Sequence, residues 1–170
     1  LVTDFPRDRF PSELRYVSIA DHFAEVRQLG GCYLRLQFFQ PGMAAVLGQR
    51  IAWLDLDSVI CGDLDPLFGR REPLVLYRSD SLRTTRWNGS FVLGDVDANA
   101  EIWTRFDMAT TPQMLRDMRA LKNSGPRGTD QAYLHTLYDY DTPHVTSADG
   151  IYHWGRSKMR VLPENARIVT

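Results

Sequence analysis

The chain has 170 residues, of which 44% are hydrophobic and 24% charged, and its formal net charge is −1. This length and composition are those of an ordinary globular protein, so we expect a single domain over residues 1–170. The balanced charge gives no indication of a nucleic-acid partner or of binding to an anionic membrane. No apolar run reaches the ~18 residues of a membrane span.

Cysteine usage bears on the compartment. The chain has two cysteines, Cys32 and Cys61, which make neither a disulfide framework nor a Cys-x-x-Cys motif. A reducing compartment fits this usage, and we predict a cytoplasmic protein. Cys61 lies in an apolar run, so we expect it to be a small core residue.

Short apolar runs alternate along the chain with segments that have helical spacing. Strands are predicted at 16–19, 51–54, 74–77 and 91–93. Between the first two of these, a helical stretch is predicted to follow Gly30 and Gly31 and to continue past Pro41 to Leu47.

Three more helices are predicted in the second half of the chain. Asp97 is expected to cap the first, Thr111 and Pro112 to begin the second, and Thr129 to cap the third. Residues 123–128 form a loop by composition. Strands that alternate with helices predict an α/β fold, in which ligands bind at the carboxyl ends of strands.

One predicted strand ends in two acidic residues, Asp55 and Asp57. In an extended segment, residues two apart point to the same side, where two carboxylates can hold a hard divalent cation that in turn binds a phosphate. The alternative is that both are ordinary residues of a turn that ends the strand. Asp63 and Asp65 we interpret as turn and helix-cap residues before Pro66.

Four segments resemble, in chain order, motifs of the nucleotide-sugar glycosyltransferases of the GT-A fold, and most closely the group that contains glycogenin and bacterial lipopolysaccharide galactosyltransferases. The segments are residues 31–36 (Gly-Cys-Tyr-Leu-Arg-Leu), 50–57 with 62–64 (Arg-Ile-Ala-Trp-Leu-Asp-Leu-Asp and Gly-Asp-Leu), 87–91 (Trp-Asn-Gly-Ser-Phe) and 128–131 (Gly-Thr-Asp-Gln). The resemblance implies a GT-A-type fold with a mixed central sheet flanked by helices.

The resemblance also implies roles for the residues that match these motifs. Asp55 and Asp57 would bind a divalent metal, Mn²⁺ or Mg²⁺, that bridges the donor diphosphate. Arg35 would approach the sugar or phosphates of the donor, although it could equally be an ordinary ion-paired arginine. Asn88 and Ser90 would line the sugar pocket, although an Asn-Gly pair is foremost a turn signal.

The last matching segment would supply the catalytic residues. The resemblance implies that Asp130 hydrogen-bonds hydroxyl groups of the donor sugar and that Gln131 lies close to its anomeric carbon. The alternative for Asp130 is a helix cap.

The implied activity is metal-dependent transfer of a hexose from a nucleoside-diphosphate sugar, with UDP the expected nucleotide, to a saccharide, a lipid-linked or a protein acceptor, with retention of configuration. In this group of enzymes, a strand that holds the nucleotide precedes the matching segments and a third metal ligand, a His, follows them. We therefore expect a fragment that is truncated at both ends and lacks part of the donor site.

Two other interpretations remain open. Residues 55–59 also resemble the nucleophile loop of haloacid-dehalogenase-like phosphatases, with residues 94–97 as a faint acidic motif. In that case Asp55 would be the nucleophile and Asp57 the acid/base. The second alternative is a degenerate module that binds a sugar nucleotide without turnover. His153 we interpret as a packed or surface residue rather than a metal ligand.

Overall fold

The structure is a computed structural model. It describes residues 2–3, 6–13, 15, 17–29, 32–79, 86–118, 129–154 and 160–170. The predicted loop at 123–128 and the three glycines Gly30, Gly31 and Gly128 lie outside these ranges.

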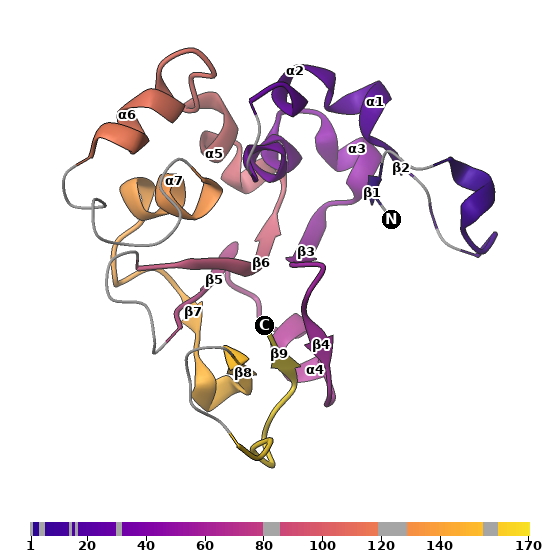
Figure 1. Ribbon diagram of the computed structural model, residues 1–170, viewed down its shortest axis with the longest axis vertical. Helices are drawn as coiled ribbons and strands as arrows, with labels where there is room; N and C mark the ends of the chain where they lie inside the picture. Colours follow the sequence, from indigo (N-terminus) through magenta and orange to yellow (C-terminus); the bar gives the residue numbers. More distant parts are fainter. Residues whose placement is uncertain are drawn as a thin grey trace.

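A mixed four-stranded sheet runs through the middle of the structure (Figure 1), with strand order β3-β6-β5-β7. Its strands are β3 (Arg50–Leu54), β6 (Asn88–Asp95), β5 (Leu74–Tyr77) and β7 (His144–Val145). Strand β6 pairs antiparallel with β3 and with β5, whereas β7 pairs parallel with β5. The strands predicted at 51–54 and 74–77 are confirmed, and so is the mixed α/β character.

Strand β6 is longer than predicted. It begins at Asn88, three residues before the apolar run 91–93. The residues at its start are typical of turns, but they are held by pairing with strands on both sides, which sequence alone does not indicate. The polar segment expected as a loop before this strand is therefore the first part of the strand.

Two smaller sheets accompany the central one. Strands β4 (Val59–Ile60), β9 (Ile168–Val169) and β8 (Ile151–Tyr152) form a sheet in the order β4-β9-β8, and β1 (Val2–Thr3) pairs parallel with β2 (Val17–Ser18). Of the strand predicted at 16–19, the described part is β2, and Ile19 already belongs to a helix. Cys61 was expected in the core but is exposed, because β4 is an edge strand.

The two faces of the central sheet are covered differently. In β5, Leu74 and Leu76 face a core with the larger helices, whereas Val75 and Tyr77 face a core with the three-stranded sheet and Leu67. This alternation is that of a strand buried on both faces. Figure 1 shows most helices above the central sheet and the three-stranded sheet with α4 (Asp65–Phe68) below it.

The helical elements are short. They are η1 (Arg7–Arg9), α1 (Ile19–His22), α2 (Ala24–Arg27), η2 (Tyr33–Phe39), α3 (Met43–Leu47), η3 (Asp97–Asn99), α5 (Glu101–Thr104), α6 (Thr111–Asp117), α7 (Asp130–Leu137) and η5 (Ser147–Asp149). Within the described ranges, no helix has the length and apolar character needed to cross a membrane.

Three sequence-based expectations about helix ends can be compared with the structure. Thr129 caps α7, because its hydroxyl accepts a hydrogen bond from the amide of Ala132 at 3.4 Å. Pro112 lies in the first turn of α6, as predicted. Asp97 is not a cap: it is the first residue of η3, and the next helix begins at Glu101.

Before α4, Asp63 is the turn residue expected from sequence, whereas Asp65 is not a cap: it is the first residue of the helix, and Leu64 occupies the cap position. The carboxylate of Asp63 accepts a hydrogen bond from the amide of Asp65 at 2.9 Å, and Pro66 follows in the first turn of the helix. The predicted helical stretch after residue 31 is a 3₁₀ helix, η2, followed by the separate α3. It is interrupted between Phe39 and Met43, where Pro41 lacks an amide donor and Gly42 has a φ of 91°.

We predict that the cap of α7 contributes measurably to stability. Thr129→Ala removes the acceptor for the amide of Ala132 and should lower the free energy of unfolding by about 0.5–2 kcal/mol. Thr129→Ser keeps the hydroxyl and should stay close to wild type in urea unfolding. A Ser variant as unstable as the Ala variant would contradict the capping role.

Candidate active site

The two predicted metal ligands lie where β3 ends. The amide of Asp55 donates to the carbonyl of Ser90 at 3.1 Å, so Asp55 prolongs the pairing between β3 and β6. The amide of Ser58 then donates to the carbonyl of Asp55 at 3.0 Å and closes a turn. The acid pair was expected in an extended segment and instead occupies this turn, with Asp55 partly buried and Asp57 exposed.

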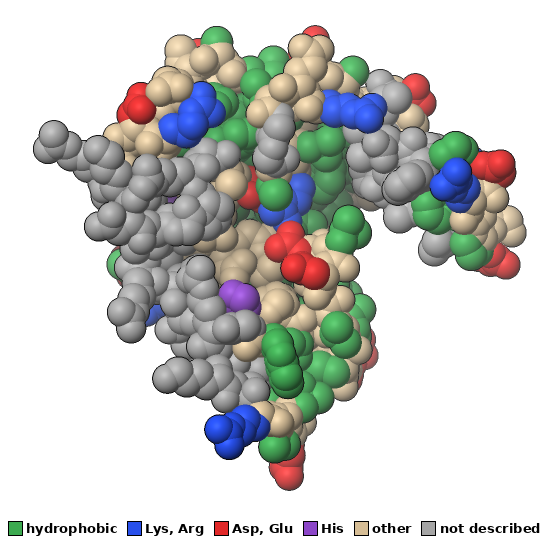
Figure 2. Space-filling view, in the orientation of Figure 1, with side chains coloured by type: hydrophobic (Ala, Val, Ile, Leu, Met, Phe, Trp, Pro, Cys, Tyr) green, Lys and Arg blue, Asp and Glu red, His purple; other side chains and the backbone are tan. Residues whose placement is uncertain are grey.

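Arg35 of η2 joins the acid pair to two other segments. Its Nη1 donates to Oδ1 of Asp55 and, at 2.9 Å, to the carbonyl of Gly89. Its Nη2 lies 2.8 Å from Oδ2 of Asp130. One guanidinium group therefore contacts the end of β3, the start of β6 and the start of α7. Figure 2 shows acidic side chains beside a basic one in the middle of this face, near the end of β3.

Gly89 lies at the centre of this cluster. Its carbonyl also accepts a hydrogen bond from Nε1 of Trp53 at 2.8 Å, and its amide donates to Oε1 of Gln131 at 3.3 Å. A Cβ atom at this position would lie 3.2 Å from both Arg35 Nη2 and Asp130 Oδ2. Glycine therefore allows the two charged side chains to close over the strand.

The first two residues of α7 are buried although both are polar. The side chain of Asp130 is 1% exposed and that of Gln131 is 8% exposed. Burial raises the pKa of Asp130 to about 6, a shift that Arg35 opposes and Asp55 reinforces. Asp130 thus shares the guanidinium of Arg35 with Asp55 while being almost fully buried itself, and buried acids with a charged partner are common at functional sites.

The other two predicted sugar-binding residues lie at the start of β6. Oδ1 of Asn88 accepts a hydrogen bond from the amide of Ser90 at 2.9 Å. The hydroxyl of Ser90 is buried and has no hydrogen-bond partner among the described residues. Neither side chain makes a described hydrogen bond to Arg35 or Asp130, so both residues border the cluster through the backbone of Gly89.

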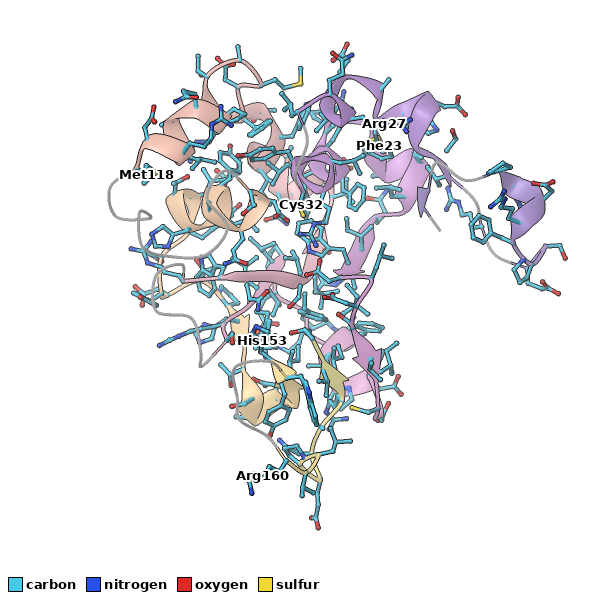
Figure 3. All side chains as sticks on the ribbon, in the orientation of Figure 1. Phe23, Arg27, Cys32, Met118, His153 and Arg160 are labelled. Atoms are coloured by element: carbon cyan, nitrogen blue, oxygen red, sulfur yellow. The ribbon has the colours of Figure 1, made fainter. Side chains whose placement is uncertain are left out.

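Sequence reasoning missed two neighbours of the site. Trp53 precedes Asp55 by two residues, and the alternation of a strand could have placed it on the same face. Cys32 is exposed beside Arg35; partial burial and the nearby Asp130 raise the pKa of its thiol, while Arg35 lowers it. Figure 3 labels Cys32 above the central sheet.

The acid pair can be tested as a cation site from its donor set. Within the described part of the chain, no group of three or more His, Cys, Asp or Glu side chains is arranged to hold a metal. Asp55 and Asp57 would supply two carboxylates, and Mg²⁺ or a similar hard cation is commonly held by one or two carboxylates with phosphate and water completing its shell. The donor type of Asp55 and Asp57 is therefore compatible with a hard divalent cation.

Space for a ligand lies next to Asp57. A hollow of about 480 Å³ is lined by Asp57, Val59, Cys61, Trp154, Leu162, Val169 and Thr170. Asp57 lies in the turn before β4, Val59 lies in β4 and Cys61 directly follows it. His153 is not part of this lining, and its Nδ1 lies 3.0 Å from the carbonyl of Thr170.

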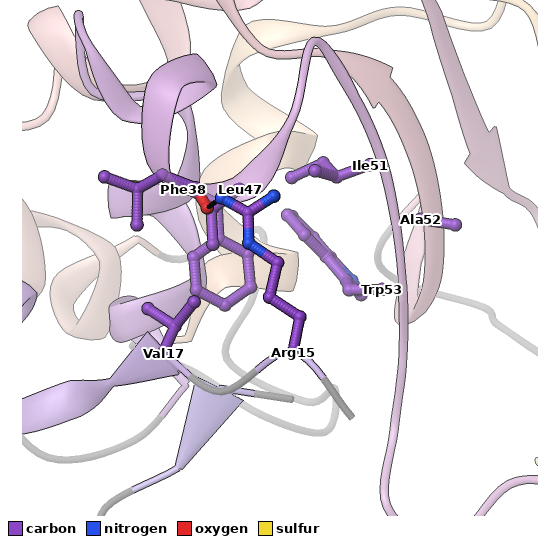
Figure 4. Close-up of a pocket in the computed structure, with 8 residues that line it drawn as sticks. Arg15, Val17, Phe38, Leu47, Ile51, Ala52 and Trp53 are labelled. Carbon is purple, nitrogen blue, oxygen red and sulfur yellow. Dashed lines mark hydrogen bonds between the residues drawn. The ribbon is translucent and has the colours of Figure 1, made fainter. Parts of the chain in front are cut away.

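A second hollow, of about 160 Å³, lies beside β3 (Figure 4). It is lined by Arg15, Val17, Phe38, Val46, Leu47, Ile51, Ala52 and Trp53. Arg15 donates to the carbonyls of Ala45 and Val46, and the lining contains no acidic residue. This hollow therefore lacks the groups that would bind a cation.

The phosphatase interpretation required a second acidic motif near Asp55. In the register of β3 and β6, Arg50 pairs with Asp95 and Leu54 with Phe91. Asp95 therefore lies at the opposite end of the strands from Asp55, and its carboxylate bonds to Arg50 at 2.5 Å. This geometry does not support the phosphatase alternative.

Comparison with known proteins gives little beyond this geometry. No protein-family model matches the sequence, and no curated protein does. Among solved structures, the galactosyltransferase LgtC in complex with donor and acceptor sugar analogues aligns over 93% of this chain and 66% of its own, with 13% identity and a TM-score of 0.49. The chain thus spans just under two thirds of the length of LgtC. A likeness of this size does not assign the chain to a family.

We predict a characteristic pH dependence for Asp130. Its pKa is about 6 in the folded protein against a usual value of 3.8. Between these two pH values, the carboxyl is protonated in the folded state and ionised in the unfolded chain. This carboxyl favours folding below about pH 4, and the contribution is lost as the pH rises through about 6. Relative to Asp130→Asn, wild type should lose up to about 3 kcal/mol of stability between about pH 4 and pH 7.

Urea unfolding in metal-free buffer measures this difference. Asp107 is an exposed carboxyl whose pKa is lowered by a hydrogen bond from the amide of Ala109, so Asp107→Asn should give a difference of the opposite sign. A difference between wild type and Asp130→Asn that does not change with pH would contradict the raised pKa.

Proposed function

We propose that the protein is a metal-dependent glycosyltransferase that moves a hexose from a nucleoside-diphosphate sugar, with UDP the favoured nucleotide, to the hydroxyl of a saccharide, lipid-linked or protein acceptor, with retention. One observation carries the proposal. Each of the four motif segments contributes to a single cluster of contacts, through Arg35, Asp55, Gly89, Asp130 and Gln131. The four segments are far apart in sequence, and the glycosyltransferase resemblance predicted a shared site for Arg35, Asp55, Asp130 and Gln131; from the third segment it predicted Asn88 and Ser90, which flank Gly89.

The end of β3 would hold the diphosphate. Asp55 and Asp57 are the residues that would bind Mn²⁺ or Mg²⁺, beside the hollow that begins at Asp57. When bound, the cation would neutralise charge that develops on the departing diphosphate. Arg35 would add a second, fixed positive charge close by, because its guanidinium group is only 16% exposed and is already oriented by two carboxylates.

The start of α7 would bind the sugar. Asp130 can accept hydrogen bonds from sugar hydroxyl groups, and such bonds to a carboxylate are strong where water is scarce. The amide of Gln131 would lie at the reacting carbon, and its Oε1 is oriented by the amide of Gly89. Arg35 would keep Asp130 in position and favour its charged form, which accepts hydrogen bonds on both oxygens.

We predict that the full-length protein releases UDP slowly from a UDP-hexose in the presence of Mn²⁺ and does not hydrolyse simple phosphate monoesters. Cleavage of the sugar–diphosphate bond leaves an intact nucleoside diphosphate, whereas a phosphatase would form an aspartyl phosphate at Asp55. Coupled UDP detection and a phosphate-release assay on the same preparation distinguish the two reactions.

The Asp55→Asn variant gives the matching control. Monoester hydrolysis that disappears in this variant, without turnover of a UDP-sugar, would overturn the proposal in favour of a phosphatase. Binding of UDP and Mn²⁺ without any UDP release from a panel of UDP-hexoses and acceptors would instead identify a module that binds sugar nucleotides without turnover.

We also predict that binding of the cation with UDP depends on Asp57. Mn²⁺ with UDP should raise the melting temperature of the full-length wild-type protein, and Asp57→Asn should abolish this rise. The variant should fold normally without ligand, because the exposed Asp57 makes no described contact that folding requires. Asp63→Asn, which changes an acid of the next turn, should keep the ligand response. An unchanged response in Asp57→Asn would exclude Asp57 as a ligand.

A further inference from the structure

Trp53 connects the parts of the proposed donor site from beneath. Its indole Nε1 donates to the carbonyl of Gly89 at 2.8 Å, and the Cζ atom of Arg35 lies 5.5 Å from the centre of its ring. The side chain is 5% exposed. It belongs to β3 and precedes Asp55 by two residues, so one rigid side chain links β3 to η2 and to β6.

The ring of Trp53 is itself fixed by two aromatic neighbours. The rings of Phe38 and Phe39 meet it edge-on, with ring centres 6.1 Å and 5.8 Å away and interplanar angles of 68° and 66°. Edge-to-face packing of this kind restricts the orientation of the indole. Figure 4 shows Phe38 and Trp53 among the side chains that line the hollow beside β3.

Trp53 thereby helps to orient two groups of the cluster, the carbonyl of Gly89 and the guanidinium of Arg35. The carbonyl of Gly89 has two hydrogen-bond donors, Trp53 Nε1 and Arg35 Nη1, which together use both of its lone pairs. The indole face attracts the guanidinium of Arg35 by a cation–π interaction. Loss of the indole N–H would leave the carbonyl of Gly89 with Arg35 as its one described donor and would remove the side-chain link between Trp53 and the start of β6.

We infer that Trp53 is a positioning residue for the sugar half of the donor, acting through the carbonyl of Gly89 that its N–H binds, an inference that rests on the proposed function. Its contact with Arg35 is made by the face of the ring, which a phenyl ring also offers. Its contacts reach the proposed sugar-binding strand and the arginine. They do not reach Asp57, which lies in the exposed turn after β3. Trp53 should therefore matter for the hexose much more than for the nucleoside diphosphate and its cation.

The test compares two quantities in the full-length protein: kcat/KM for UDP-hexose and the inhibition constant of UDP with Mn²⁺. Trp53→Phe keeps an aromatic ring and removes the N–H donor. We expect kcat/KM for UDP-hexose to fall at least tenfold, which corresponds to about 1.4 kcal/mol. The inhibition constant of UDP with Mn²⁺ should stay within about twofold. A purely structural defect would weaken both measurements together.

Two further variants keep the test decisive. Trp103→Phe makes the same exchange at a partly buried tryptophan that packs against Phe106, outside the cluster, and should change neither quantity. If Trp53→Phe does not fold, replacement of Trp53 by benzothienylalanine keeps the shape of the indole, removes only the N–H, and should reproduce the fall in kcat/KM alone.

The outcomes separate the inference from the function on which it rests. Wild-type activity that is retained in the Trp53 variants, or an equal loss of UDP and UDP-hexose binding, would overturn the role of Trp53 and leave the glycosyltransferase proposal intact. No UDP release by the wild-type protein would overturn the proposed function, and the inference with it.

Discussion

The bridge that Arg35 makes between Asp55 and Asp130 is the interaction on which the site depends. An isolated buried charge is costly, so Asp130, at 1% exposed, is tolerated because the guanidinium lies 2.8 Å away. Arg35 is tolerated for the same reason, because two carboxylates face it. Removing either partner would leave a poorly solvated charge without compensation. The cluster therefore constrains folding and ligand chemistry together, and its residues cannot be exchanged one at a time.

Strand pairing explains why these residues meet. The antiparallel register pairs Leu54 with Phe91, so the end of β3 and the start of β6 lie side by side at the same end of the strands. The side chain on each strand that faces the helices is then directed at η2 and α7. Gly89 completes the arrangement by having no side chain, since a Cβ atom there would press on both Arg35 and Asp130. A glycine in a central strand usually weakens it, and here it allows close approach.

Sequence predicted the parts of this arrangement that depend on local pattern. The strands at 51–54 and 74–77 and the Thr129 cap follow from apolar runs and capping chemistry, and they are present. The motif series also placed Arg35, Asp55 and Asp130 in one site. Features set by tertiary structure could not be predicted in this way: the polar start of β6, the exposed Cys61 after an edge strand, and the Trp53 N–H bonded to a carbonyl of another strand.

Asp55 is fixed by Arg35 whereas Asp57 is exposed, and this difference would let Asp55 bind Arg35 and a cation at the same time. Arg35 bonds to Oδ1 of Asp55, and no hydrogen bond to Oδ2 is found in the described part of the chain. A carboxylate offers about four lone-pair sites, so a cation could bind Asp55 without displacing the arginine. Asp57 lies beyond the last strand residue, in a turn whose Leu56 is fully exposed and contributes no packing. Under the proposed function, the fixed Asp55 would place the cation and the exposed Asp57 would complete its shell, while Arg35 would stay in contact with Asp130.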